Sequence, residues 1–250
     1  MTGTTSLHVK TLALCLTMAI IGASPGGATV RSSSRPAATT AFGASLAPAD
    51  SSFTSRAPLV AFTFRVSPID GPTRALMTGK TWRPGCPVSL ARLRLVTVTY
   101  FGFDLRSHVG HLVVNADVTG PVVKALRTLY ESRFRIRQMR LVDYFAGSDE
   151  TSMVNDNTSA FNCRIVPNST VWSQHAYGRA LDLNPLENPE VQGSVVDPPG
   201  ARPWADRSRL RPGMIMHGGV AWRAFEAVGW KWGGDWTSLK DYQHFSANGL

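Results

Sequence analysis

The stretch RLRLVTVTYFGFDLRSHVGHLVVN, residues 92–115, decides the fold class because it holds two neighbouring strand patterns. Residues 92–100 alternate with a two-residue period and are rich in β-branched side chains, which is typical of a strand with one buried face. Residues 111–115 are predicted to form its partner, with Gly110 in the connection. The stretch therefore predicts the paired strands of a small sheet.

The best helix pattern of the chain follows directly, at residues 120–134. Thr119 is placed to cap this helix, and Pro121 suits its first turn. Charged residues face away from an apolar stripe with helical spacing. The stripe consists of Val122, Leu126 and Leu129.

The later elements are short and mixed. Residues 136–142 and 179–183 are predicted strands, and residues 219–228 are a predicted helix that ends at Gly229. The stretch 143–178 has little periodicity, and long loops of this kind are uncommon unless they are functional. Because strands and helices do not alternate strictly, we expect an α+β fold with a small antiparallel sheet and flanking helices.

Composition and charge narrow the function classes. The 250 residues are 43% hydrophobic, which excludes a fully disordered polyelectrolyte. The formal net charge of +9 favours anionic partners, such as a bacterial envelope polymer, nucleic acid or anionic lipid. Because Lys and Arg are scattered and no nucleic-acid recognition motif is present, we do not expect nucleic acid as a partner.

The N-terminal residues have the order of a secretory signal. Lys10 precedes an apolar run at residues 12–23, and small residues follow, so residues 1–28 are predicted to be a signal peptide that is removed. The run is shorter than the roughly 20 residues of a membrane span, so no transmembrane anchor is expected. Residues 29–57 are predicted to be a flexible linker, and residues 58–250 the folded domain. An alternative role for the linker is envelope binding through its arginines, Arg31, Arg35 and Arg56.

The mature chain is expected to be a monomer that is secreted to the cell envelope or the extracellular space. Export favours disulfides over free thiols, and two cysteines remain once the signal peptide is removed. Cys86 and Cys163 are therefore predicted to form a disulfide.

The segment SQHAYGRALD, residues 173–182, carries the first candidate for chemistry. His175 offers an imidazole, and Asp182 offers a carboxylate seven residues later. On one straight strand the two side chains would lie on opposite faces, so their convergence requires a turn. Gly178 permits that turn.

A second segment, GWKWGGDWTSLKDYQHF at residues 229–245, places Asp241 three residues before His244. Two histidines and one carboxylate form a ligand set that zinc accepts, with the fourth position left for water. Asp241 is placed to take a proton from that water. Spacing alone leaves open whether these residues meet, because a single His or Asp in a loop is usually structural or solvated.

The two segments together resemble the motifs of the zinc D-Ala-D-Ala carboxypeptidases and L-alanyl-D-glutamate endopeptidases of bacteria and phages. The resemblance covers about residue 140 to the C-terminus. It implies the hedgehog/DD-peptidase fold, one zinc ion and peptide bonds of peptidoglycan stems as substrate. It also implies that the zinc ligands are His175, Asp182 and His244 and that the general base is Asp241.

The same family uses an arginine upstream of the first motif to hold the scissile carbonyl. This chain lacks the usual Gly-Tyr-Arg-Ser form of that segment and offers NDNTSAFNCR at residues 155–164, so Arg164 is the candidate. The alternative is an arginine that only forms a salt bridge within a loop. Dipeptidase members have Glu where Asp241 stands, and the endopeptidase branch has Asp, so this position favours an endopeptidase.

Several other residues are candidate substrate contacts, each with a structural alternative. They are Ser159, Asn162, Ser173 and Trp236. The structural alternative for Asn157, Ser159 and Asn162 is to hydrogen-bond the loop backbone, and Trp230 and Trp232 suit core packing. His108, His111 and His217 are expected to be surface or structural residues rather than ligands.

Taken together, the sequence predicts a secreted zinc peptidase of peptidoglycan, either a carboxypeptidase or an endopeptidase. The main alternative is a non-catalytic wall-binding module that keeps the fold and the metal. Alanine at Asp241 separates the two readings, because an enzyme would lose turnover and a binding module would lose nothing.

Overall fold

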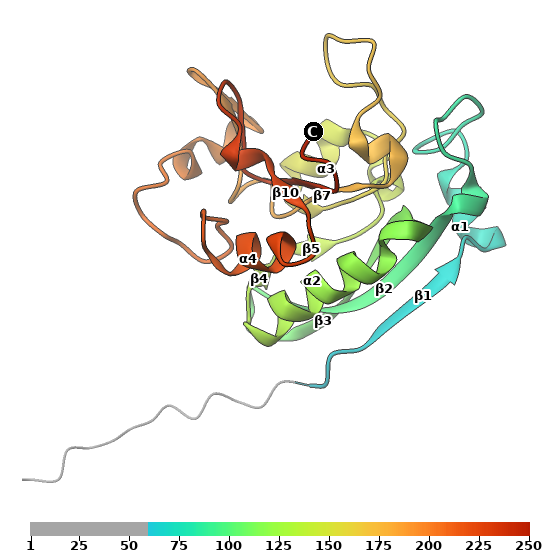
Figure 1. Ribbon diagram of the computed structural model, residues 1–250, viewed down its shortest axis with the longest axis horizontal. Helices are drawn as coiled ribbons and strands as arrows, with labels where there is room; N and C mark the ends of the chain where they lie inside the picture. The colour runs from blue at the N-terminus through green and yellow to red at the C-terminus, as the bar shows by residue number, and fades with distance from the viewer. Residues whose placement is uncertain (1–59) are drawn as a thin grey trace, which may run out of the picture. The chain divides into compact units, whose positions relative to one another are not determined.

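A computed structural model describes residues 60–250 (Figure 1). The predicted signal peptide at residues 1–28 and linker at residues 29–57 lie outside the described residues. Between residues 60 and 250, no helix combines the length and the apolar character that crossing a bilayer requires.

The largest sheet contains three strands in the order β1-β2-β3, and these three pair antiparallel. Its strands are β1 Phe64–Pro68, β2 Leu93–Gly102 and β3 Ser107–Asn115. A fourth, short strand, β4 Arg135–Ile136, pairs with the end of β2 in parallel. The predicted strand pair at residues 92–115 is confirmed, and the sheet is mixed only at this short addition.

Two helices pack with this sheet around the main core. α2 Thr119–Glu131 lies along the sheet, and α4 Val220–Glu226 lies beside α2 (Figure 1). The predicted stripe of α2 is buried, because Val122, Leu126 and Leu129 are each at most 2% exposed. This core continues into the short strands near the C-terminus through Leu181, Trp230, Trp232 and Phe245.

A second, smaller core contains residues of both β2 and β3 and lies where α1 Gly71–Met77 and the disulfide meet them. Cys163 is 1% exposed in this core and is bonded to Cys86, so the predicted disulfide is confirmed. The remaining members of this core are Met77, Val88, Leu90, Leu93, Val113, Leu141 and Phe161. The disulfide therefore ties the segment before the first motif to the sheet.

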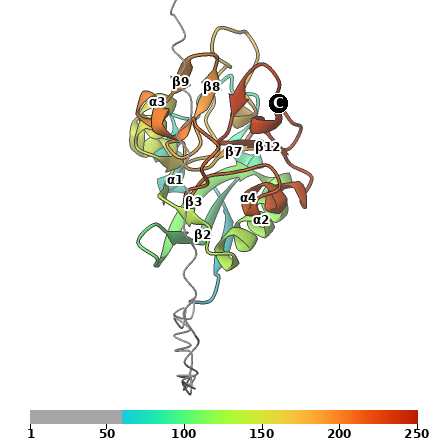
Figure 2. The same ribbon diagram turned by 90° about the vertical axis from the view of Figure 1, so that its left-hand side faces the viewer.

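The short strands form three small sheets that hold the candidate site. One has the order β10-β12-β7, one has the order β11-β8-β9, and β5 pairs with β6 in parallel. Figure 2 shows β7, β8, β9 and β12 gathered in one half of the described part. Their bounds are Gln138–Met139 (β5), Asn157–Thr158 (β6), Ala180–Asp182 (β7), Glu190–Gln192 (β8), Val195–Asp197 (β9), Lys231–Trp232 (β10), Lys240–Asp241 (β11) and His244–Ser246 (β12).

One further α-helix and six short 3₁₀ helices connect these strands. The α-helix is α3 Asp149–Val154. The 3₁₀ helices are η1 Leu90–Arg92, η2 Ala116–Val118, η3 Val142–Phe145, η4 Gln174–Tyr177, η5 Pro199–Trp204 and η6 Gly233–Asp235. The architecture of residues 60–250 is thus α+β, with mostly antiparallel small sheets, as the sequence predicts.

Two local predictions near the first strand pair are wrong. Gly110 lies inside β3, opposite Val98, rather than in the connection. Met139 packs against it so closely that a Cβ would lie 2.6 Å from the Met139 Cβ, which is a reason for glycine within a strand. Thr119 does not cap α2, because η2 already precedes the helix and the Thr119 hydroxyl donates to the Ala116 carbonyl.

The prediction for residues 136–178 is also wrong in part. The single strand predicted at 136–142 is divided among β4, β5 and η3, and the predicted loop contains α3, β6 and η4. Two-residue strands carry no periodicity that a sequence pattern can reveal, since each forms only where its partner lies. The predicted strand at 179–183 and helix at 219–228 are confirmed with slightly shorter bounds.

Candidate metal centre

The first motif brings His175 and Asp182 together through a tight turn. Ser173 begins η4, and its hydroxyl accepts a hydrogen bond from the His175 N–H at 3.3 Å. Gly178 ends η4 with φ of 66°, a left-handed conformation that favours glycine. The chain then enters β7, whose last residue is Asp182. The turn predicted at Gly178 is confirmed.

Gly178 also lies against the main sheet. The Asn115 N–H donates to the Gly178 carbonyl at 2.8 Å, and a Cβ on Gly178 would lie 2.7 Å from the Asn115 nitrogen. Any side chain would therefore push the turn away from the end of β3. The glycine of the motif fixes both the direction of the chain and its distance from the sheet.

The second motif supplies His244 through strand pairing. β12 pairs antiparallel with β7, and in this register His244 lies directly opposite Asp182. Phe245, the next residue, is 1% exposed and stacks on Phe225 with ring centroids 4.1 Å apart. Because Phe245 anchors β12 in the core, the alternate face of the strand presents His244 to the site.

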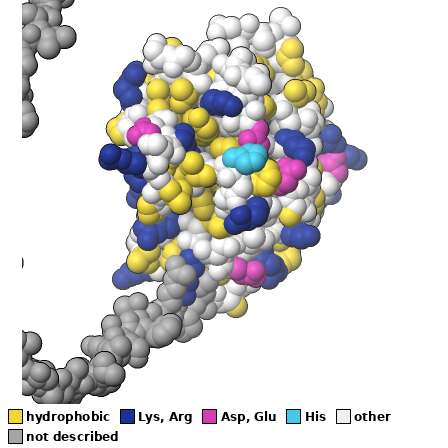
Figure 3. Space-filling view, turned by 60° about the vertical axis from the view of Figure 1, so that its left-hand side comes forward, with side chains coloured by type: hydrophobic (Ala, Val, Ile, Leu, Met, Phe, Trp, Pro, Cys, Tyr) yellow, Lys and Arg dark blue, Asp and Glu magenta, His cyan; other side chains and the backbone are white. Residues whose placement is uncertain are grey.

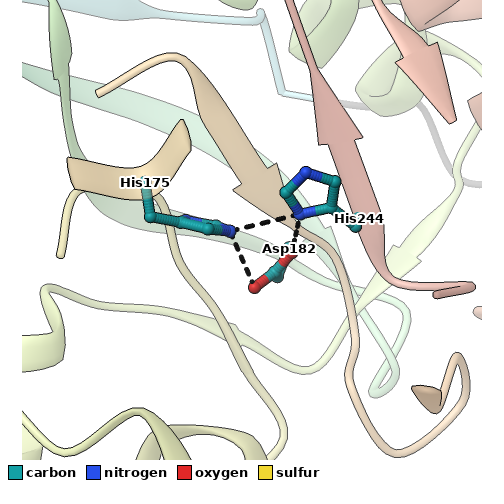
Figure 4. Close-up of side chains that lie close together, drawn as sticks. All are labelled: His175, Asp182 and His244. Atoms are coloured by element: carbon teal, nitrogen blue, oxygen red, sulfur yellow. Dashed lines mark hydrogen bonds and ion pairs between the residues drawn. The ribbon is translucent and has the colours of Figure 1, made fainter. Parts of the chain in front are cut away.

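The three side chains converge with the spacing of a metal site (Figure 4). His175 Nε2 lies 3.1 Å from Asp182 Oδ2 and 3.3 Å from His244 Nδ1, and His244 Nδ1 lies 3.0 Å from Asp182 Oδ1. Ligand atoms about 2.0 Å from a tetrahedral zinc are about 3.3 Å from one another. The donor set and its spacing therefore fit zinc, with a fourth position left open.

Each histidine has a partner on its other ring nitrogen. His175 Nδ1 faces the main-chain carbonyl of Ala160, and His244 Nε2 lies 3.1 Å from the main-chain oxygen of Leu250. When these nitrogens carry the proton and donate, His175 Nε2 and His244 Nδ1 keep free lone pairs that point at the site. In the neutral imidazoles these outer partners therefore favour the tautomers that leave His175 Nε2 and His244 Nδ1 free to bind a metal.

The charges within the centre are strongly coupled. Burial alone would raise the pKa of Asp182, but the His175 and His244 imidazoles lower it below its usual value. Burial alone would lower the pKa of His244, but the hydrogen bond to Asp182 and the charges of Asp182 and Asp241 raise it to about 9. In the absence of a cation the site therefore holds a proton on His244 next to an ionised Asp182.

Asp241 lies beside this centre at the end of β11. Its Oδ1 is buried without a hydrogen-bond partner among the described residues. Burial, together with the charges of Asp182 and Glu190, raises the pKa of Asp241 to about 7, against the lowering effect of His244 and Arg164. A carboxyl with a pKa near neutrality and a free oxygen is suited to accept and return a proton.

Glu190 is a residue of the site that the sequence analysis misses. It lies opposite Asp241 in the β11–β8 pairing and opposite Asp197 in the β8–β9 pairing. Burial raises the pKa of Glu190, and the charges of Asp197 and Asp182 raise it further. No local pattern marks Glu190, because its position beside Asp241 follows only from the pairing of two short strands.

Arg164 lies at the edge of this group of acids. Its Nη2 forms an ion pair with Asp149 Oδ2 at 2.8 Å, and its buried Nε has no partner among the described residues. The Arg164 charge lowers the pKa of both Asp241 and Glu190. The salt bridge considered as an alternative role thus exists.

The predicted substrate contacts occupy different positions around the centre. Ser159 exchanges main-chain hydrogen bonds with Asp182 at 3.0 and 2.9 Å. Asn162 donates from Nδ2 to the Gly147 carbonyl at 3.3 Å, and the Ser173 hydroxyl is bonded within η4. The Trp236 ring lies 5.5 Å from the His244 ring. The Asn162 main-chain N–H also donates to the His175 carbonyl at 3.2 Å, so all four residues contact the elements that carry the candidate ligands.

The other histidines stay outside the metal centre. His108 pairs with Asp104 at 2.9 Å, and the His111 ring lies 3.1 Å from the Thr97 hydroxyl. His217 pairs with Asp235 at 2.8 Å and is 69% exposed. Trp230 and Trp232 are buried in the main core, as predicted. Asn157 bonds to main-chain groups of Arg140, which fits its structural reading.

Comparison with known proteins agrees with this geometry. Residues 167–247 match the model of a family described as D-alanyl-D-alanine carboxypeptidase. No curated protein and no solved structure matches the chain. The matched segment contains all three candidate ligands and Asp241, whereas Arg164, Ser159 and Asn162 precede it. The resemblance of the two motifs is therefore confirmed, because residues 167–247 are similar to the zinc D-Ala-D-Ala carboxypeptidase family.

Proposed function

We propose that the protein is a secreted zinc peptidase that hydrolyses peptide bonds in the stem peptides of peptidoglycan, on a hedgehog/DD-peptidase fold. The observation that carries this proposal is the set of three buried ligand atoms at tetrahedral spacing with Asp241 beside it. The family match supports a peptidase that acts on peptidoglycan-type peptides. Mass spectrometry of the products distinguishes removal of a terminal D-Ala from cleavage within the stem.

The zinc ligands, Asp241 and Arg164 have separate roles in the proposed reaction. A zinc ion held by His175, Asp182 and His244 would acidify a water molecule and polarise the scissile carbonyl. The Asp241 carboxylate accepts the proton of the attacking water and returns it to the leaving amine, so no covalent intermediate is needed. Arg164 donates from its unpartnered Nε to the carbonyl oxygen as negative charge develops there.

The surroundings of the centre support a polar peptide as substrate. Ser159, Asn162, Ser173 and Trp236 are the proposed substrate contacts. Trp236 is half-buried, so part of its ring remains open to a ligand.

The proposed location rests on export and charge. The disulfide between Cys86 and Cys163 is typical of an oxidising compartment. On the face shown in Figure 3, Lys and Arg side chains are spread across the surface rather than gathered in one stripe. A diffuse positive charge suits attraction to an anionic envelope polymer. We propose that residues 1–28 direct secretion and that residues 29–57 link the domain to the site of export.

Asp241→Asn tests the proposal. We expect turnover of peptidoglycan to fall by about 10²–10⁴-fold with zinc still bound, because the amide cannot accept the proton. Asp104→Asn is a matched control, since Asp104 pairs only with His108 and main chain at the surface. If the unaltered protein binds peptidoglycan but neither it nor the variants release products, the non-catalytic binding module is the correct reading.

A further inference from the structure

The chain segment Asn248–Leu250 turns back on the metal centre. The Leu250 N–H donates to the Asn248 side-chain oxygen at 3.2 Å, and Gly249 has φ of 84°. This tight turn aims the main-chain oxygen of Leu250 at His244 Nε2, 3.1 Å away. In Figures 1 and 2 the C-terminus lies beside the short strands that carry the ligands. We call residues 248–250 the strap.

Trp236 holds the strap in place. Its indole N–H donates to the Gly249 carbonyl at 3.0 Å, and its own main-chain N–H is fixed by the Gly233 carbonyl at 3.1 Å. The Trp236 ring also lies 5.5 Å from the His244 ring. Trp236 therefore contacts both the strap and the ligand that the strap orients.

The hydrogen-bond partners of the outer ring nitrogens of His175 and His244 differ in how deeply they are buried. The partner of His175 is the carbonyl of Ala160, a residue that is 3% exposed in the main core. The partner of His244 belongs to Leu250, which is 71% exposed. The outer hydrogen bond of His244 thus depends on a surface segment and on one indole hydrogen bond, whereas the outer hydrogen bond of His175 depends on the core.

We propose that the strap and Trp236 form a positioning device that sets the zinc affinity of the centre by holding His244 with Nε2 as the donor and Nδ1 facing the metal. This inference rests on the proposed zinc site and not on the peptidase reaction. Groups that hydrogen-bond the outer nitrogen of a ligating histidine fix its tautomer and ring orientation. Trp236 would accordingly act through His244, in addition to any contact with substrate.

Two variants test the role of the strap, and a third serves as the control. Deletion of residues 248–250 removes the oxygen that accepts the hydrogen bond of His244 Nε2. Trp236→Phe keeps an aromatic ring at this position but removes the indole N–H. We expect each to lower zinc affinity by about 10–100-fold, measured by competition with a chelating dye. Trp222→Phe is the matched control, because it removes an indole hydrogen bond to Asp235 and leaves the strap untouched. Its zinc affinity should equal that of the unaltered chain.

A second readout separates positioning from folding. In the zinc-loaded unaltered protein, the His244 Nε2–H signal in a ¹⁵N–¹H spectrum should be protected from solvent exchange. In the chain without residues 248–250 this imidazole N–H should exchange rapidly, while the main-chain amide signals of the remaining fold stay unchanged. Equal zinc affinity and equal protection in all variants would overturn the inference and leave the peptidase proposal standing. Zinc binding that depends on the strap in a protein without peptidase activity would support the inference and refute the enzyme, and no zinc binding by the unaltered chain would refute both.

Discussion

His244 lies directly opposite Asp182 across the β12–β7 pairing, and His244 Nδ1 is 3.0 Å from Asp182 Oδ1. The two residues are separated by 62 positions in the chain, yet strand register alone brings them together. A slip of one residue would move His244 to the other face of β12. The metal centre is therefore as well defined as the packing of the strands that carry it.

Zinc affinity is predicted to rise with pH up to about 9. Without metal, the raised pKa of His244 keeps this imidazole protonated at neutral pH, whereas Asp182 is already ionised because its pKa is lowered. Zinc needs neutral imidazole, so binding at pH 7 should release a proton from His244. Below pH 9 the affinity should fall by about tenfold per pH unit through this group.

Calorimetry in two buffers with different ionisation enthalpies measures this released proton directly. The difference in apparent binding enthalpy should correspond to about one proton from His244 at pH 7. An affinity that stays constant between pH 6 and 9 would contradict the assignment of His244 as a ligand that must lose a proton.

Gly178→Ala is predicted to weaken both the fold and the metal centre. The left-handed conformation at φ of 66° and the 2.7 Å approach to the Asn115 nitrogen oppose any Cβ. Strain of this kind costs about 1–3 kcal/mol. Urea unfolding measures the loss of stability, and zinc titration measures the displacement of His175. Gly71→Ala, at a position where a Cβ meets nothing within 4 Å, is the control.

Glu187 is predicted to make stability fall as pH rises. It is 2% exposed, and burial together with the charge and hydrogen bond of Asp156 raises the pKa of Glu187 to about 8, despite Arg137. Between its usual pKa of 4.5 and about 8, the folded protein holds a proton that the unfolded chain releases. The contribution of Glu187 to the free energy of unfolding is therefore fully present below pH 4.5 and is lost as the pH rises to about 8.

Glu187→Gln removes this titration and should flatten the decline in the free energy of unfolding between pH 5 and 8. The measurement is urea unfolding at several pH values. Glu226→Gln is the control, because Glu226 is a surface residue paired with Lys231. If the unaltered protein is as stable at pH 8 as at pH 5, Glu187 does not hold this additional proton in the folded state.

Removal of the disulfide by Cys86→Ala with Cys163→Ala is predicted to lower stability. The bond closes a loop with a sequence separation of 77, which the chain-entropy relation values at about 4–5 kcal/mol at most. Because Arg164 follows Cys163 directly, we also expect a lower kcat when Arg164 loses its anchor. Chemical unfolding and steady-state kinetics of the zinc-loaded variant measure the two effects. An unchanged unfolding midpoint would show that packing around Met77 and Leu93 already fixes the segment.

Residues that follow long periodic patterns are the ones that the sequence predicts well. The stripe of α2 and the pattern of β2 extend over nine or more residues, so their burial can be predicted without a partner. For β3 only the second half, residues 111–115, is predicted, and the strand begins at Ser107. The ligands His175, Asp182 and His244 can be predicted because the two motifs hold them, and Gly178 supplies a visible reason for the turn.

The short strands and the site residues that the sequence does not predict depend on contacts between distant segments. β5 and β6 have two residues each and form only because Met139 and Thr158 meet across the fold. Glu190 reaches Asp241 through a strand pairing that no local pattern indicates. The strap likewise depends on Leu250 meeting His244, which only the folded chain shows. Short elements around a site are therefore the part that sequence patterns miss.

The most direct test of the account is mass spectrometry of purified peptidoglycan after incubation with the protein, with and without a chelator and after zinc is restored. We predict zinc-dependent products. Loss of a single D-Ala would identify a carboxypeptidase, and release of stem peptides or cut cross-links would identify an endopeptidase. Peptidoglycan that remains intact under every condition, while the protein still binds it, would contradict the proposal that this metal centre hydrolyses peptide bonds.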